Sequence, residues 1–160
     1  MNNTKAQERH TECLQQMQDM KAVIDAAPLD ISARLLTRYS VILCCGTIER
    51  CFKGIISDYF TFHPQVSNFV NRHVYKTSMN PSWDDISGVL KSFDDAWKLQ
   101  FKQRSKEENK SALNSLVDAR NKVAHGENMN HSFNEILQYY NRAWEIIVIV
   151  DNIVKSEDHV

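Results

Sequence analysis

The feature that most constrains this chain is how seldom its helix-forming sequence is interrupted. Only four glycines and three prolines occur among 160 residues. Both residue types disfavour helix interiors, so their scarcity favours long helices joined by short connections. Apolar side chains recur at intervals of three and four residues, and a period-two alternation never persists. The sequence therefore predicts an all-α fold.

Six segments carry the helical spacing, and short polar or proline-containing stretches separate them. They comprise residues 4–26, 31–62, 65–77, 82–104, 105–124 and 133–155. The longest has a strong apolar stripe that begins at Val41, and Pro64 stops it. We predict a single domain over residues 1–160, folded as a bundle of about five to six helices with antiparallel neighbours.

Polar residues mark where several of these helices begin and end. Asp30 is a predicted N-cap for the segment that follows it. The sequences SKEE (105–108) and SFNE (132–135) both match the capping box, in which a serine is followed three residues later by glutamate. Gly126 follows the fifth segment and is a natural residue to end that helix.

Charge gives no global indication of a nucleic-acid partner, because the net charge is only −1. Its distribution is uneven, however, since residues 98–125 hold seven lysines and arginines against three acidic residues. A basic stretch of this kind can attract phosphate, or it can be an ordinary solvated helix face. Charge alone leaves both interpretations open.

The four cysteines indicate a reducing compartment. Cys13, Cys44, Cys45 and Cys51 include no CxxC pair, and three of them lie in one apolar helical run. They are typical of small core hydrophobes and not of a disulfide frame or a zinc site.

Neither a metal centre nor a membrane segment is expected. His63 and His73 have no partner at the spacing of zinc ligands. The first residues, MNNTKAQERH, are polar and unlike a signal peptide. The longest apolar run, residues 146–150, is far shorter than the roughly 20 residues that span a bilayer. We expect a cytoplasmic protein without a membrane association or a cofactor.

The stretch LVDARNKVAHGEN, residues 116–128, places an arginine where the apolar pattern would put leucine. Arg120 follows Leu113 by seven residues, Leu116 by four and Val117 by three, so it continues their stripe. An arginine on an inward stripe must be paired, extend to solvent, or face a cleft or a partner.

His125 stands five residues after Arg120, so the two side chains point about 140° apart on an ideal helix. Asn121 and His125 are four residues apart and share a neighbouring face. Arg120 and His125 would converge if the helix frayed before Gly126, or against a second copy of the helix.

These residue types suit the cleavage of RNA without a metal ion. Histidine transfers protons near neutral pH, and arginine holds phosphate oxygens as charge develops on them. A purely structural explanation is also available: Arg120 would pair with a buried acid while His125 caps a helix carbonyl.

The segment RNKVAHG resembles the R-x4-6-H signature of the HEPN superfamily, matched by Arg120, Asn121 and His125. The wider pattern resembles the RiboL-PSP-HEPN subgroup over about residues 30–155. It includes an early long helix with an acidic residue, here TIERCFKGII with Glu49. It also includes a tryptophan-containing segment ahead of the motif, here NPSWDDISGVLKSFDDAW.

The resemblance implies a helical bundle that commonly forms homodimers, with two motifs meeting in a cleft. It implies a metal-independent endoribonuclease that leaves a 2′,3′-cyclic phosphate and a 5′-OH, in a toxin–antitoxin or phage-defence setting. An antitoxin or regulatory protein is then an expected partner besides RNA. Other members are inactive and bind a protein or RNA, and a neutralising partner of a nucleotidyltransferase is a third interpretation.

Four further residues are candidates for positioning the motif or for binding RNA, and three of them also have a purely structural or solvated interpretation. Glu49 either orients Arg120 or His125, or forms a structural ion pair. Asn121 supports the motif, as the polar residue after its arginine. Lys122 and Lys110 either line the cleft and add affinity for phosphate, or are merely solvated.

Overall fold

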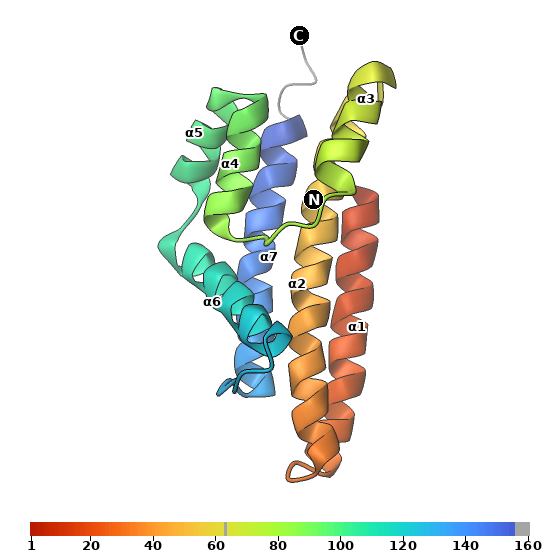
Figure 1. Ribbon diagram of the computed structural model, residues 1–160, viewed down its shortest axis with the longest axis vertical. Helices are drawn as coiled ribbons and strands as arrows, with labels where there is room; N and C mark the ends of the chain where they lie inside the picture. The colour runs from red at the N-terminus through yellow and green to blue at the C-terminus, as the bar shows by residue number, and fades with distance from the viewer. Residues whose placement is uncertain (63, 156–160) are drawn as a thin grey trace.

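The computed structural model describes residues 1–62 and 64–155, and His63 lies outside them (Figure 1). The described residues form seven α-helices and no strand. The helices are α1 (Thr4–Ala26), α2 (Ile31–Tyr59), α3 (Pro64–Val70), α4 (Trp83–Phe93), α5 (Asp95–Arg104), α6 (Glu107–Ala124) and α7 (Phe133–Lys155). A 3₁₀ turn, Phe60–Phe62, follows α2, and a π-helical turn, Asn71–Tyr75, follows α3. The predicted all-α fold is confirmed.

Helix α2 lies at the centre of the bundle, packed against α1, α6 and α7 (Figure 1). The four cysteines are buried free thiols, as predicted for core hydrophobes. The first turns of α2 and the end of α1 project beyond the ends of α6 and α7. By length and composition alone α2 could also cross a membrane, a test that the core helix of a bundle passes as well.

Several helix ends follow the predicted capping. Asp30 Oδ1 accepts from the Ser32 N–H at 2.8 Å. Ser132 and Glu135 form the reciprocal capping box, with the Glu135 carboxylate 2.8 Å from the Ser132 backbone nitrogen. Gly126 has φ +73°, the left-handed conformation that ends a helix with little strain in glycine.

The single helix predicted over residues 82–104 is wrong, because it breaks at Asp94. The Asp94 side chain accepts from the Ala96 N–H at 2.6 Å and begins α5. The break lets α5 fold back on α4, so that the rings of Trp83 and Phe101 lie 5.4 Å apart. On one straight helix these residues would be about 27 Å apart. Burial of both aromatic rings against each other therefore favours two helices.

The predicted capping box at residues 105–108 is also wrong. The Ser105 hydroxyl donates to the Phe101 carbonyl at 2.7 Å and closes α5 instead. Lys106 is the N-cap of α6 and provides no side-chain bond. The serine can serve only one of the two helices that meet there, and it serves the one that ends.

Candidate active site

The motif lies on the last turns of α6, where that helix crosses α2 (Figure 1). Leu113, Leu116 and Val117 are buried on the inward side, as their spacing predicts. Arg120 continues their stripe but is only half-buried. Its Nη1 donates to the Asn121 Oδ1 at 3.2 Å.

Arg120 has no ion-pair partner in the described part of the chain. A half-buried guanidinium without a carboxylate has most of its hydrogen-bonding capacity free. The structural explanation by a buried acid therefore fails for the described residues, and Arg120 remains available to an anion.

His125 is the C-cap of α6, and its side chain is exposed. Its backbone N–H donates to the Asn121 carbonyl at 3.0 Å, so the backbone and not the ring closes the helix. Among residues 1–62 and 64–155 the imidazole has no hydrogen bond or ion pair. Both ring nitrogens are therefore accessible for proton transfer.

Arg38 is a residue at this site that the sequence did not indicate. From α2 its Nη1 donates to the Glu127 carbonyl at 3.1 Å, and its Nη2 lies 3.5 Å from the Val123 carbonyl. A guanidinium at a helix C-terminus satisfies carbonyls that lack helical partners and complements the helix dipole. Arg38 thus holds the loop that carries His125, from a position far away in sequence that no local spacing reveals.

Glu49 lies near the motif but bonds elsewhere. It pairs with Lys53 one turn along α2, and its Oε1 accepts from the Met79 N–H at 3.1 Å. Cys45 lies one turn before Glu49 on α2. Its Sγ donates to the Leu116 carbonyl at 3.4 Å, and Leu116 lies one turn before Arg120 on α6. Burial raises the pKa of the Cys45 thiol to about 12, the charge of Arg120 opposes that rise, and the charge of Glu49 adds to it. Glu49 thus lies on the part of α2 that α6 contacts, in the ion pair anticipated as its structural role.

The two candidate RNA-binding lysines lie at opposite ends of α6. Lys122 is exposed on the last turn, beside the motif. The Lys110 ammonium sits over the Trp83 ring, 4.6 Å from its centroid, in a cation–π contact. Ten residues of helix separate Lys110 from Arg120, about 15 Å along the axis. The fold therefore keeps Lys122 with the motif and sets Lys110 apart.

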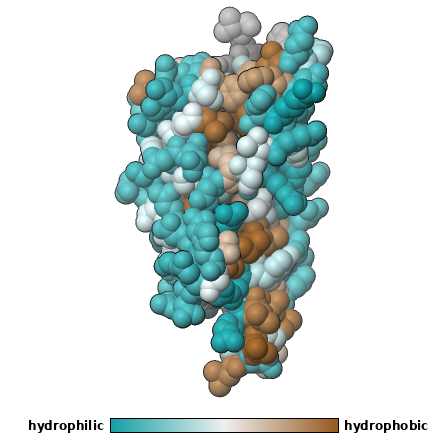
Figure 2. Space-filling view, in the orientation of Figure 1, coloured by the Kyte–Doolittle hydropathy of each residue, from teal (hydrophilic) through white to brown (hydrophobic). Residues whose placement is uncertain are grey.

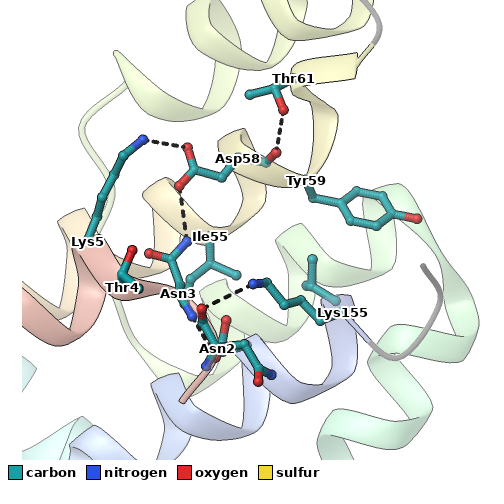
Figure 3. Close-up of a pocket in the computed structure, with 11 residues that line it drawn as sticks. Asn2, Asn3, Thr4, Lys5, Ile55, Asp58, Tyr59, Thr61 and Lys155 are labelled. Atoms are coloured by element: carbon teal, nitrogen blue, oxygen red, sulfur yellow. Dashed lines mark hydrogen bonds and ion pairs between the residues drawn. The ribbon is translucent and has the colours of Figure 1, made fainter.

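A polar hollow of about 310 Å³ lies away from the motif, among the first residues, the end of α2 and the end of α7 (Figure 3). Asp58 pairs with Lys5 at 3.4 Å and accepts from the Asn3 side chain at 3.1 Å. The buried Asp151 accepts from the backbone N–H groups of Asn2 and Asn3. These bonds fasten the segment before α1 to α2 and α7, which gives the hollow a structural role.

The all-α bundle is consistent with a HEPN-type domain, a class that often has nuclease activity. A family model described as RiboL-PSP-HEPN matches residues 8–156, and the chain belongs to that family. No curated protein and no solved structure matches it.

Proposed function

We propose that the protein is a metal-independent endoribonuclease whose active site is composed across a homodimer. The observation that carries this proposal is the state of the two motif side chains. Arg120 is half-buried without a carboxylate among the described residues, and the exposed His125 ring is unbonded there. A helix end with only a structural role needs neither an unpaired arginine nor an accessible imidazole, whereas metal-free cleavage at a phosphate can use both.

In the proposed reaction the ribose 2′-oxygen attacks the adjacent phosphorus. His125 takes the proton of the 2′-OH as the new O–P bond forms. The bond from phosphorus to the 5′-oxygen breaks, and a second imidazole, the partner's His125, gives that oxygen a proton. Arg120 holds the non-bridging oxygens as their negative charge grows. The products are a 2′,3′-cyclic phosphate and a 5′-OH.

An exposed apolar stripe on α2 supports the second copy. Ile31, Leu35 and Ile42 share a helix face with Arg38 and are 62%, 57% and 40% exposed. The brown patch on the lower half of the molecule in Figure 2 falls on this part of α2 and the preceding turn. Two copies of such a stripe can cover each other around a two-fold axis. That arrangement would bring two motif ends to one cleft, because Arg38 holds the end of α6 beside the stripe.

We further propose a toxin–antitoxin or phage-defence setting, with an antitoxin or regulatory protein as partner. Family membership supports this part of the proposal, and the chain itself adds no separate observation to it.

The test is an RNA cleavage assay in the presence of EDTA. Wild-type protein should cleave, and Arg120→Ala or His125→Ala should lower the rate by about 10²- to 10⁴-fold. His131→Ala is the matched control, since this histidine lies six residues on and packs edge-on against Tyr139. Products should accept phosphate from polynucleotide kinase without prior dephosphorylation, which reports a 5′-OH. Equal cleavage by wild type and His125→Ala would refute the assignment, and RNA binding without cleavage would favour a non-catalytic module.

A further inference from the structure

A second hollow, of about 460 Å³, opens where α1, α2 and residues 75–78 meet. Arg9 comes from α1, Arg50 and Lys53 come from α2, and Lys76 follows the π-helical turn. Glu49 is the acidic residue of the lining. Cations from three separate segments thus converge on one concave surface.

Most of this positive charge is unpaired. The buried Lys53 pairs with Glu49 and also donates to the Thr77 carbonyl, which neutralises the one carboxylate. Arg9, Arg50 and Lys76 form no ion pair within the residues that the structure describes. Asp58 lines an adjoining hollow with Arg9, but it pairs with Lys5. Three like charges facing one hollow repel each other, so an anion there would be stabilised.

Two glycines of α2 bear on the hollow: Gly46 lines it, and Gly54 lies beneath Arg9, one of its cations. A Cβ at Gly54 would lie 3.2 Å from the Arg9 Nη1, so the missing side chain lets the guanidinium lie against the helix. A Cβ at Gly46, which lines the hollow, would meet nothing within 4 Å. The backbone of α2 is therefore open to a close approach at Gly46, although glycine disfavours a helix interior.

The hollow adjoins the motif along α2. Glu49 belongs to its lining, and Cys45 lies one turn earlier on α2. The Cys45 thiol donates to the Leu116 carbonyl at 3.4 Å, one turn before Arg120 on α6. Cys45 and Glu49 are four residues apart, about one helical turn or 6 Å. An RNA strand with one phosphate at Arg120 would therefore have a second cationic site, the hollow, a short distance along α2.

We propose that this hollow binds a backbone phosphate of the RNA that flanks the cleaved one. Two arginines and a lysine suit a phosphate, because guanidinium groups bond its oxygens in pairs and the ammonium adds charge. The inference rests on the proposed ribonuclease function for the source of that phosphate. A free phosphate would satisfy the same chemistry, so the test separates these two sources.

The experiment measures binding of a fluorescent 2′-O-methyl RNA, which cannot be cleaved because its 2′-oxygen carries no proton. The double variant Arg50→Gln/Lys76→Gln removes two exposed cations of the hollow. Lys102→Gln/Arg104→Gln removes the same charges from α5 and is the control. The first variant should bind more weakly, with the slope of log K against log salt reduced by about 0.7 for one lost phosphate contact. The control should match wild type, and thermal unfolding should show that both variants fold.

Two results would overturn the proposal. Equal RNA binding by the two double variants would show that RNA does not bind in the hollow. A stabilisation of wild type by inorganic phosphate that Arg50→Gln/Lys76→Gln abolishes would then assign the hollow to a free phosphate. The cleavage assay with His125→Ala is independent of this binding assay, since the 2′-O-methyl RNA reports binding whether or not the protein is a nuclease. In an active enzyme the variant should raise KM and leave kcat unchanged.

Discussion

The two halves of one face of α2 differ sharply. Towards its start, Ile31, Leu35 and Ile42 present exposed apolar side chains. Beyond Gly46, Glu49 and Lys53 form the wall of a cationic hollow. The end of α6, with the motif, lies against α2 and is held there by Arg38, which belongs to the apolar half. One helix face can therefore present a surface suited to a second copy and a surface suited to phosphate, both close to one site.

The largest expected effect comes from placing a charge in the apolar half of this α2 face. Leu35→Asp should shift the protein from dimer to monomer, since burying a leucine contributes about 2 kcal/mol per copy. Two copies correspond to roughly a 10³-fold weaker dimer. Cleavage should fall with the dimer fraction, as light scattering and the RNA assay can show on the same samples.

Leu99→Asp is the control for that prediction. Leu99 lies on α5 and is 58% exposed, against 57% for Leu35. The two substitutions therefore change equally accessible leucines on different surfaces. A Leu99→Asp protein that becomes monomeric, or a Leu35→Asp protein that stays an active dimer, would move the interface away from α2.

The junction of the two halves is tested by Arg38→Gln. Removing the guanidinium from the end of α6 should lower the free energy of unfolding by about 1 kcal/mol, since the side chain is partly exposed. Cleavage should fall about 10-fold with the dimer intact, because His125 would be less well positioned. Hydrogen exchange should rise in residues 121–128.

Arg34→Gln is the matched control for Arg38→Gln, since Arg34 precedes it by one turn and is exposed. It should leave exchange in residues 121–128 unchanged. If both variants lose the same activity, then the loss reflects general charge and not the bonds to Val123 and Glu127.

The smallest expected effect, on stability and RNA binding, concerns Gly46, which lines the cationic hollow. Gly46→Ala should raise the free energy of unfolding by about 1 kcal/mol, because alanine favours a helix and its Cβ meets nothing. Binding of 2′-O-methyl RNA should weaken a few-fold if phosphate approaches the backbone there. Gly54→Ala, where the Cβ would crowd Arg9, should gain less stability. Denaturant titration measures both, and tighter RNA binding by Gly46→Ala would contradict a close approach.

The sequence predicted the helices well where each depends on its own residues. Asp30, Gly126 and the capping box at 132–135 act locally, so their roles could be read directly. The break at Asp94 could not be, because it depends on Trp83 meeting Phe101 across two helices. Ser105 was assigned to the wrong helix for a related reason: two helix ends compete for one hydroxyl.

The candidate site was predicted in part. The sequence placed Arg120 on an apolar stripe, and the structure leaves its guanidinium without a carboxylate in the described residues, while its catalytic role stays a prediction. Ile42 and Cys45 lie three residues apart on α2, but Ile42 is 40% exposed while Cys45 is buried, a difference that residue type alone does not reveal. The basic run at residues 98–125 drew attention to Lys110, which lies over Trp83 instead.

The sequence by itself determined the helical class and the positions of the candidate motif residues along the chain, because periodicity and residue type are local properties. Only the tertiary structure decided which charges lack partners and which apolar side chains stay exposed. Arg9, Arg50 and Lys76 come from distant parts of the chain and converge only when α1, α2 and the segment after α3 pack together. Arg38 reaches the end of α6 for the same reason: the packing of α2 against α6 brings together residues that are far apart in the sequence.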